Sequence, residues 1–333
     1  MTIRIGINGF GRIGRAIFRA AASDPLFNDL RVVAVNDLST PEILTHLFQY
    51  DSFMGPWKGS VSLSGTTLTV NGHPTTLLAE PDPGAIPWHR HGADYVIEST
   101  GRFANLATAS AHLKGGARRV VISAPAKGEV KTLVMGINED EYDPDQDRVV
   151  SNASCTTNCL APVVRVILDH FGVRRGLLTT IHSYTADQRL LDAPHNDLRR
   201  ARSAATSLIP TTTGAAAAIG LVIPELAGRF DGLSVRVPVA NVSLVDMVME
   251  VERPTNTDAV NEVLRASQSR YLGFSMDPLV SSDYREDPRS SIVDGLSTRV
   301  IESTVKILSW YNNEWSYAHR VLDLIRHMRT MEL

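Results

Sequence analysis

The stretch "GINGFGRIGR", residues 6–15, places Gly9, Gly11 and Gly14 in the spacing G-x-G-x-x-G. A β-branched run, "IRIGI" (3–7), stands directly before this turn, and a helical pattern follows it. Glycines at these positions let the chain turn tightly and let a pyrophosphate approach bare backbone at the positive end of a helix. The strand, turn and helix together predict a dinucleotide-binding domain of the α/β Rossmann class.

The second strand of this domain is predicted by "RVVAVN" (31–36), and Asp37 follows it directly. Asp37 stands roughly 20 residues beyond Gly14, where a carboxylate accepts a hydrogen bond from the ribose 2′-OH. A carboxylate at this point disfavours a 2′-phosphate, so we expect NAD in preference to NADP.

The rest of the first half continues this pattern of short strands alternating with helical segments. Further strands are predicted at 95–100, 119–124 and 132–138, which favours βαβ units and a mostly parallel sheet. Residues 60–78 instead alternate with period two and turn at Asn71 and Gly72, which predicts an antiparallel hairpin added to that sheet.

The second half has longer strand signals and fewer helices between them. Strands are predicted at 176–184, 233–252 and 299–311, with a helix near 256–268. This order predicts an α+β catalytic domain with a mostly antiparallel sheet and helices on one face. The final segment has apolar residues in helical period, and we expect it to pack back on the first domain.

Bulk composition excludes several function classes. The chain has 333 residues, enough for two domains, with 43% apolar residues, 21% charged residues and a formal net charge of −3. These values argue against disorder and against a general attraction to nucleic acid or an anionic membrane. There is no signal-peptide pattern and no run near the roughly 18 apolar residues of a membrane helix. We therefore expect a soluble protein with a small-molecule partner.

One of the two cysteines stands in an unusually polar setting. In "SNASCTTNCLAP" (151–162), Cys155 is surrounded by hydroxyl and amide side chains and begins a helical pattern. A helix N-terminus stabilises a thiolate, which is the nucleophilic form. A buried structural cysteine is the commoner case, but the polar neighbours favour a nucleophile here. Cys155 and Cys159 have neither a disulfide nor a zinc spacing, and so few cysteines suit a reducing, cytoplasmic compartment.

His182 could act as the base for this thiol. It stands in "TTIHSYTADQ", at the end of a predicted strand and beside hydroxyl residues.

Two features of the sequence indicate an anionic substrate. Arginines of "HNDLRRARSAA" (195–205) precede "IPTTTGAA", whose hydroxyls and Gly214 backbone are suited to a phosphate, although an arginine run is more often a solvated helix face. Arg236 lies within an apolar strand, where a charge must be paired or functional.

Together these residues resemble phosphorylating glyceraldehyde-3-phosphate dehydrogenases of the glycolytic type. The segments that match in order are "INGFGRIGR", "SAPAK", "SNASCTTNCLAP", "HSYTADQ", "DLRRAR", "IPTTTGAA", "RVPVANVS" and "SWYNNEW". The resemblance implies a Rossmann NAD-binding domain at 1–154, completed by a C-terminal helix at 317–333, and a catalytic domain at 155–316. It also implies a homotetramer that oxidises glyceraldehyde 3-phosphate with NAD and inorganic phosphate, through a cysteine thiohemiacetal and thioester, to 1,3-bisphosphoglycerate.

The resemblance also assigns roles to single residues. Cys155 is implied as the nucleophile and His182 as the group that activates it. Implied cofactor contacts come from Gly9, Gly11, Arg12, Ile13, Gly14, Asp37, Ser123 and Asn313, with Arg12 and Ile13 at the pyrophosphate and Asn313 at the carboxamide. Implied contacts to the substrate's phosphate come from Thr185, Arg200 and Arg236, and contacts to attacking phosphate or substrate from Ser154, Thr156, Thr213 and Gly214. No metal is implied.

The chain departs from the family pattern in places. Pro81 stands where an arginine usually lies near the adenine, and Ala193 replaces a bulkier residue near the adenosine ribose, which leaves some use of NADP open. Two other functions remain as alternatives. Erythrose-4-phosphate dehydrogenase shares the thiol chemistry but usually has Glu in place of Asp37. A non-catalytic dinucleotide-binding protein would not need Cys155, His182 and Arg236.

Overall fold

The computed structural model describes residues 2–333, which form two compact units. Unit 1 comprises 2–133, 139–153 and 318–333, and unit 2 comprises 134–138 and 154–317. Each unit has its own sheet. Each unit carries part of the predicted site.

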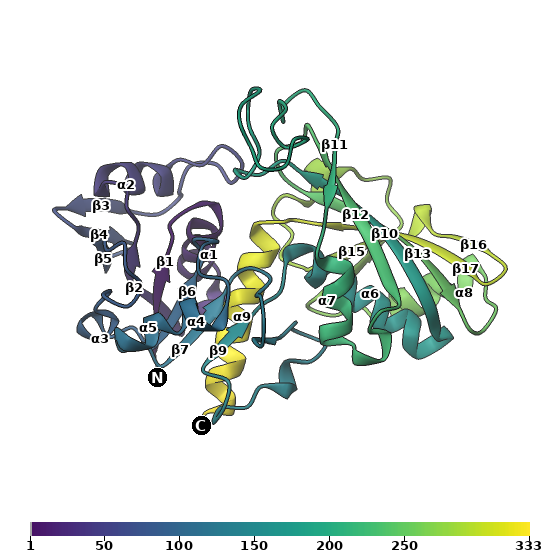
Figure 1. Ribbon diagram of the computed structural model, residues 1–333, viewed down its shortest axis with the longest axis horizontal. Helices are drawn as coiled ribbons and strands as arrows, with labels where there is room; N and C mark the ends of the chain where they lie inside the picture. Colours follow the sequence, from purple (N-terminus) through teal and green to yellow (C-terminus); the bar gives the residue numbers. More distant parts are fainter. Residues whose placement is uncertain (1) are drawn as a thin grey trace. The chain divides into compact units, whose positions relative to one another are not determined.

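Unit 1 is built on a nine-stranded sheet in the order β3-β4-β5-β2-β1-β6-β7-β9-β8 (Figure 1). Its strands are β1 (Ile3–Asn8), β2 (Leu30–Asn36), β3 (Val61–Ser64), β4 (Thr67–Val70), β5 (His73–Leu78), β6 (Tyr95–Glu98), β7 (Arg119–Ile122), β8 (Lys131–Thr132) and β9 (Val149–Ser151). β1 pairs in parallel with β2 and β6, and β6 in parallel with β7. The central strands are almost fully buried, as expected when helices cover both faces of a parallel sheet. The predicted α/β class is confirmed.

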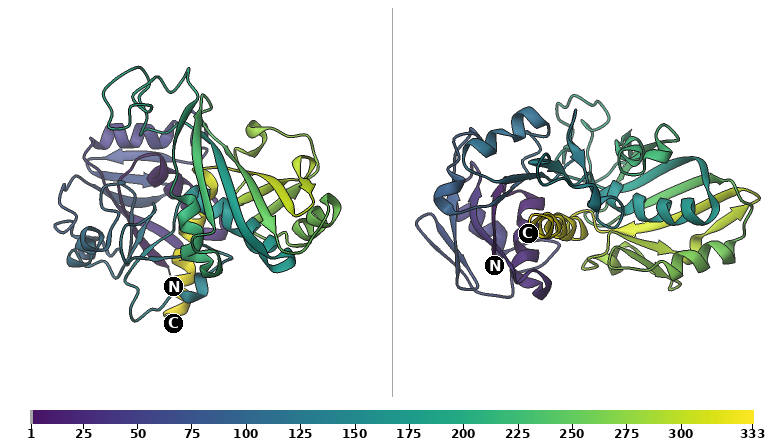
Figure 2. Two further views of the ribbon diagram at one scale, coloured as in Figure 1. Left: turned by 45° about the vertical axis from the view of Figure 1, so that its right-hand side comes forward. Right: turned by 90° about the horizontal axis from the view of Figure 1, so that it is seen from below.

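The helices of unit 1 are short apart from the first and the last. They are α1 (Arg12–Ser23), η1 (Pro25–Phe27), α2 (Pro41–Gln49), α3 (Trp88–His91), α4 (Leu106–Ala109), α5 (Ala111–Lys114), η2 (Glu139–Glu141) and α9 (Trp315–Met331). From Ala318 onward, α9 belongs to unit 1. Its His319 and Arg326 side chains bond Asp24 and Asp29, which lie just after α1. Figure 2 shows α9, in yellow, beside these purple N-terminal elements.

The predicted antiparallel hairpin is present and has one strand more than expected. β4 and β5 pair in antiparallel fashion around Asn71 and Gly72. Both residues have positive φ, 50° and 79°, as a tight hairpin turn with two left-handed residues requires. β3 adds to the outer side of β4, and β5 joins the parallel sheet beside β2.

The predicted strand at 132–138 is wrong. Only Lys131 and Thr132 are in a strand, and the chain then turns, with Ile137 and Asn138 N–H groups donating to the Val134 carbonyl. The Asn138 side chain also accepts from the Val134 N–H at 2.9 Å. Asparagine side chains compete for backbone groups in this way, which outweighs the apolar pattern of the segment.

Unit 2 is built on an eight-stranded sheet that is mostly antiparallel, as predicted. Its strands are β10 (Val173–Ser183), β11 (Ile209–Thr212), β12 (Phe230–Val237), β13 (Ser243–Val251), β14 (Leu272–Ser275), β15 (Ser291–Asp294), β16 (Arg299–Ile301) and β17 (Thr304–Tyr311). β10 lies between β12, its parallel neighbour, and β13, its antiparallel neighbour (Figure 1). β14 and β15 form the other parallel pair.

Side-chain burial shows which face of this sheet is covered. β13 and β17 alternate between buried and half-exposed residues, so one face of each strand points into the core. The helices of unit 2 are α6 (Cys155–Phe171), α7 (Ala215–Val222), α8 (Thr257–Ala266), η3 (Pro224–Leu226), η4 (Ser281–Tyr284) and η5 (Gly295–Ser297). α6 packs against β13, β15 and β17, and it carries a thiol at its first residue.

Two predicted long strands are each divided in the structure. The expected strand at 233–252 is broken between β12 and β13, where Val242 has a φ of 68°. The expected strand at 299–311 folds back on itself as β16 and β17, with Glu302 at a φ of 53° in the turn. Apolar residues stand on both sides of each break, so the two strands on either side of it read as one.

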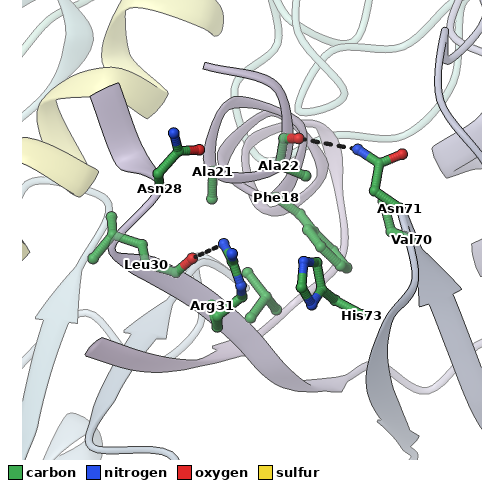
Figure 3. A pocket seen from close by; sticks show the side chains of 10 residues that line it. Phe18, Ala21, Ala22, Asn28, Leu30, Arg31, Val70, Asn71 and His73 are labelled. Carbon is green, nitrogen blue, oxygen red and sulfur yellow. Dashed lines mark hydrogen bonds between the residues drawn. The ribbon is translucent and has the colours of Figure 1, made fainter. Parts of the chain in front are cut away.

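A cavity of about 160 Å³ lies in unit 1 at the amino ends of β2 and β5. Phe18, Arg31 and His73 are among its lining residues (Figure 3). In doubly wound sheets, ligands bind at the opposite, carboxyl ends of the strands.

No helix in the described part of the chain is both long and apolar enough to span a membrane.

Candidate active site

Cys155 is the first residue of α6, as its sequence pattern predicts. Ser154 is the N-cap, and its hydroxyl oxygen accepts from the Thr157 N–H at 3.0 Å. The Cys155 side chain is half-buried and forms no disulfide. Its sulfur is therefore held at the positive end of a capped helix.

His182 lies at the end of β10 and faces this sulfur, with 3.6 Å between Cys155 Sγ and His182 Nε2. The other ring nitrogen, Nδ1, lies 2.7 Å from the carbonyl oxygen of Ser183. Arg236 Nη1 lies 3.0 Å from the same nitrogen. The carbonyl is the nearer group and only accepts, so we place the proton on Nδ1, which leaves the lone pair of Nε2 toward the sulfur. This tautomer can take a proton from the thiol.

Burial disfavours the charged forms of both Cys155 and His182. Burial raises the pKa of the Cys155 thiol, and the opposing effects of Arg236 and of nearby Thr156 donors are smaller. Burial and Arg236 lower the pKa of His182 to about 3. Burial thus opposes the stabilisation of a thiolate that the sequence predicts at the helix end.

Arg236 lies on β12 directly beside His182, its register partner on β10. Its Nη1 donates to the Ser183 carbonyl at 3.2 Å and to the Thr185 hydroxyl at 3.4 Å. Its Nε is buried and has no hydrogen-bond partner among the described residues. A buried guanidinium N–H without a partner is costly, so this group is suited to an anionic ligand.

Arg200 differs from Arg236 because its charge is already compensated. It pairs with Asp187 and Asp197, and its Nε donates to the Thr211 hydroxyl at 3.0 Å. It is close enough to lower the pKa of Arg236. The structure therefore places Arg200 near Arg236 and Thr185, but with its strongest bonds made within the protein.

Four further predicted residues lie at helix starts. Gly214 is the N-cap of α7, and the Thr213 hydroxyl accepts from the Ala215 N–H at 3.2 Å. Ser154 caps α6 as described. The Thr156 hydroxyl bonds the Tyr311 hydroxyl at 2.9 Å, so it points into the core. Tyr311, which also bonds Thr180, was not anticipated from the sequence.

Asn313 is buried just after β17 in unit 2, and neighbouring serines fix its side chain. The hydroxyls of Ser183 and Ser243 donate to its Oδ1 at 2.9 and 3.4 Å. Its Oδ1 is thereby fixed as an acceptor, which makes Nδ2 the donor side of this amide. Neither serine was anticipated, although Ser183 stands next to His182 in the sequence.

A second cavity, of about 310 Å³, lies in unit 1 at the carboxyl ends of its central strands. The residues that line it are Asn8, Gly9, Gly11, Asn36, Asp37, Leu38, Glu80, Pro81, Ser99, Thr100, Arg102 and Phe103. Gly9, Gly11 and Asp37 thus come together here as predicted contacts. Arg12, Ile13 and Gly14 form the first turn of α1 next to it, and Ser123 bonds the Glu98 carbonyl from the end of β7.

Gly9, Gly11 and Gly14 differ in why a side chain at each position would be unfavourable or tolerated. Gly9 has a φ of 93°, which favours glycine. A Cβ on Gly14 would lie 2.2 Å from the Gly9 carbonyl oxygen, so only glycine allows this approach. A Cβ on Gly11 would meet no atom within 4 Å. That open space is where a pyrophosphate could reach the backbone.

The side chains beside the turn leave room for a ribose and a pyrophosphate. Asp37 accepts from the Phe10 and Ser39 N–H groups, one on each oxygen, and each oxygen retains a lone pair for a ribose hydroxyl. The Arg12 guanidinium pairs with Asp51 and lies over the Phe53 ring. Its backbone N–H is then the group suited to a pyrophosphate. Across residues 2–333, no cluster of three or more His, Cys, Asp or Glu side chains could hold a metal ion.

Comparison with known proteins identifies the family of this chain. Residues 3–106 match the family described as the NAD binding domain of glyceraldehyde 3-phosphate dehydrogenase, and residues 154–313 match its C-terminal domain. The chain belongs to the glyceraldehyde-3-phosphate dehydrogenase family. The glyceraldehyde-3-phosphate dehydrogenase of Geobacillus stearothermophilus is 52% identical over 338 residues, which cover 100% of both chains. Glyceraldehyde-3-phosphate dehydrogenase 1 of Bacillus subtilis is 51% identical over 98% of each chain, and glyceraldehyde-3-phosphate dehydrogenase 2 of Streptomyces avermitilis is 51% identical over 97% of this chain and 98% of its own.

This glyceraldehyde-3-phosphate dehydrogenase is an enzyme whose cofactor is NAD. The residues of the 310 Å³ cavity fit an adenosine group, because Gly11 leaves its backbone open and Asp37 retains acceptors for ribose hydroxyls. Pro81, a departure from the family pattern, lines this cavity and offers no charge to the adenine. Sequence reasoning missed Asn8, Asn36 and Thr100, although a polar residue at the end of each of several neighbouring strands is itself a signal.

Proposed function

We propose that Cys155 is the nucleophile and His182 the general base of this glyceraldehyde-3-phosphate dehydrogenase. The observation that carries the proposal is the 3.6 Å approach of His182 Nε2 to Cys155 Sγ, with the ring oriented by the Ser183 carbonyl. The enzyme oxidises glyceraldehyde 3-phosphate with NAD, and the relatives named above carry this activity in their names.

Proton transfer to His182 activates the sulfur. The Sγ proton passes to Nε2 as the sulfur adds to the aldehyde carbon, forming a thiohemiacetal on Cys155. NAD, when bound, supplies the acceptor for the hydride. His182 holds the proton only briefly, because burial and Arg236 disfavour its imidazolium form. Cys155 then carries the oxidised acyl group as a thioester, and attack by inorganic phosphate releases 1,3-bisphosphoglycerate.

The anionic groups of the reaction are assigned to two sets of residues. Arg236 and Thr185, with Arg200 nearby, bind the phosphate of the substrate, which supplies the partner that Arg236 Nε lacks. Ser154, Thr213 and Gly214, with the Thr156 N–H, bind the attacking phosphate or the substrate at two helix starts.

The cofactor contacts are assigned within each unit separately. In unit 1 they are Gly9, Gly11, Arg12, Ile13, Gly14, Asp37 and Ser123, and in unit 2 Asn313. The steric roles of the glycines and the free acceptors of Asp37 support the first set. The serine-fixed amide of Asn313 supports the second.

We further propose that the enzyme is a cytoplasmic homotetramer. The location is supported by the two cysteines, which are both free, as is usual in a reducing compartment. Assembly is supported by exposed leucines in the segment after β10, among them Leu191 and Leu198, the latter 83% exposed. Light scattering of the purified protein distinguishes a tetramer from smaller species.

A matched pair of cysteine variants tests the catalytic proposal. Cys155→Ala is expected to lower phosphate-dependent NADH formation at least a thousandfold while leaving ADP-ribose binding unchanged. Cys159→Ala, one turn further along α6 and bonded to Ser291, is expected to retain activity. NADPH formation and erythrose 4-phosphate oxidation are measured in parallel. Comparable turnover by Cys155→Ala would refute covalent catalysis, and a preference for erythrose 4-phosphate would refute the substrate assignment.

A further inference from the structure

A chain of buried polar side chains lies behind the cofactor cavity of unit 1 and has no part in the chemistry at Cys155. Its members are Trp88, His112, Glu98, Asn8 and Asn36, each at most 3% exposed. Asn8, Asn36 and Glu98 are the last residues of three neighbouring strands, β1, β2 and β6, and are paired in register. Burying so many polar groups costs free energy unless every one is hydrogen-bonded.

The hydrogen bonds at one end of this chain have a fixed direction. The indole N–H of Trp88 can only donate, and it donates to His112 Nδ1 at 3.1 Å. The single proton of His112 must then be on Nε2, which donates to Glu98 Oε2 at 2.9 Å. His112 therefore presents a donor, and only a donor, to Glu98.

The other end is fixed in the same way by a backbone group. The Glu80 N–H donates to Asn36 Oδ1 at 2.8 Å, which sets the orientation of that amide. Asn36 Nδ2 then donates to Asn8 Oδ1 at 2.9 Å, and Asn8 Nδ2 donates to Glu98 Oε2 at 2.6 Å. Both ends of the chain thus converge as donors on one oxygen of Glu98.

The second oxygen of Glu98 is equally occupied. The N–H and the hydroxyl of Thr100 both donate to Oε1, the N–H at 2.8 Å. With four donors, Glu98 must be an acceptor at every position, which is the pattern of a carboxylate. Within residues 2–333, no arginine or lysine forms an ion pair with it. Directional N–H and O–H groups alone hold this buried charge.

The donors around Glu98 also form the wall of the cofactor cavity. Asn8, Asn36, Glu80 and Thr100 all line it. Thr100 also lies against the glycine turn, since a Cβ on Gly9 would be 2.7 Å from the Thr100 N. Glu98 therefore determines which atoms of this wall point inward, although it does not line the cavity itself.

We propose that Glu98, oriented by His112, is a positioning residue for the adenosine half of the dinucleotide. It accepts from the Asn8 amide and from Thr100 and so holds both in place, while the Glu80 N–H orients Asn36, so the cavity is preorganised before the cofactor arrives. This rests on the proposed cofactor role of the cavity. Asp37, at its rim, is the carboxylate assigned to the adenosine ribose.

The isosteric variant Glu98→Gln tests the proposal. Whichever way the new amide is turned, its NH₂ group faces either Asn8 and His112 or Thr100, all of which are donors. We expect the dissociation constant for ADP-ribose and the KM for NAD to rise at least tenfold. We expect kcat at saturating NAD to stay within twofold, and the KM for glyceraldehyde 3-phosphate to stay unchanged.

A matched control separates positioning from general loosening. Glu332→Gln alters another buried carboxylate of unit 1, bonded by Tyr95 and Tyr142 and away from the cavity lining. It is expected to lower stability without changing the affinity for ADP-ribose. Wild-type affinity in folded Glu98→Gln, or an equal loss of affinity in both variants, would overturn the proposal.

Two further variants test the proposal if Glu98→Gln does not fold, and test the cavity assignment separately. If Glu98→Gln does not fold, Trp88→Phe frees His112 from its fixed tautomer and is expected to weaken ADP-ribose binding at least threefold, and unchanged binding would overturn the proposal. Gly11→Ala tests the cavity itself, because its methyl group enters the open space at the turn. Unchanged binding in Gly11→Ala would mean that the cavity assignment has failed, which is distinct from a failure of the role given to Glu98.

Discussion

At the scale of single residues, the protonation state of the Cys155 and His182 pair determines how the enzyme starts its reaction. Burial raises the pKa of the thiol and lowers that of the imidazole, so both shifts favour the neutral forms. A neutral His182 can act as a base, whereas an imidazolium could not. In the proposed mechanism the thiolate is accordingly formed by proton transfer to His182.

The lowered pKa of His182 predicts a dependence of stability on pH. In the folded protein this pKa is about 3, against an ordinary histidine pKa of 6.5, so the unfolded chain binds more protons between these values. Stability is therefore retained above pH 6.5 and is lost as pH falls toward 3. Between pH 7 and pH 5, His182 is expected to cost about 2 kcal/mol of unfolding free energy.

Urea unfolding at pH 7 and pH 5 measures this effect. His182→Gln, which cannot titrate, is expected to lose less stability over this interval than the wild type. His170→Gln, an exposed histidine near the end of α6, is expected to behave as the wild type. An equal loss in His182→Gln and the wild type would contradict the assignment of a buried, neutral His182.

At the scale of elements, helix starts carry most of the candidate chemistry. The first turn of α6 presents Cys155, α7 begins at Gly214, and α1 begins at the glycine turn. Helix N-termini present unpaired N–H groups, which suit a sulfur anion, a phosphate and a pyrophosphate alike. Capping residues and glycine spacing reveal such starts in a sequence.

The glycine turn of α1 allows a prediction that separates folding from binding. Gly14→Ala places a methyl group against the Gly9 carbonyl and is expected to lower the unfolding free energy by about 1–3 kcal/mol. Gly11→Ala meets no protein atom and has an ordinary φ of −69°, so its stability is expected to change by less than about 0.5 kcal/mol. Its affinity for ADP-ribose is nevertheless expected to fall.

Urea unfolding and ADP-ribose titration of the two variants check this contrast. A Gly14→Ala protein as stable as the wild type would show that the turn is looser than the structure indicates.

Among the strands, apolar periodicity predicted β1, β2 and β10 correctly, but it did not predict the breaks at Val242 and Glu302. These turns depend on single residues with positive φ, which an apolar pattern does not mark.

At the scale of the whole molecule, hydrogen bonds and an ion pair at Glu332 attach the end of the chain to the sheet of unit 1. The Glu332 side chain is 3% exposed and accepts from the Tyr95 and Tyr142 hydroxyls at 2.7 and 3.0 Å. Arg119 Nε lies 2.9 Å from the same carboxylate. Burial raises the pKa of Tyr142 to about 12, so its hydroxyl remains a donor. This cluster holds α9 on the first sheet.

Removing the charge of Glu332 is expected to loosen that attachment. Glu332→Gln should lower the unfolding free energy by roughly 2 kcal/mol, since charged hydrogen bonds are lost and Arg119 keeps no full partner. Glu129→Gln, an exposed carboxylate of the same unit, should change it by less than about 0.5 kcal/mol. Thermal or urea unfolding compares the two, and equal stabilities would contradict a fastening role for Glu332.

The sequence by itself determined the identities of the chemical groups and their local settings. Glycine spacing, strand and helix periodicity, and polar neighbours marked the turn at Gly9, the carboxylate of Asp37 and the thiol of Cys155, because these features depend on residues close together in the chain. The functional boundaries of the domains and the assigned site roles stay predictions.

Only the tertiary structure decided the charge states and the hydrogen-bond directions. Burial and Arg236 set the pKa of His182, Asp187 and Asp197 compensate Arg200, and Tyr311 takes the Thr156 hydroxyl. Glu98 gathers donors from strands far apart in the sequence. Desolvation and hydrogen bonding depend on what surrounds a group in space. The surrounding residues come from segments far apart in the chain, and the sequence does not show which of these segments will be neighbours.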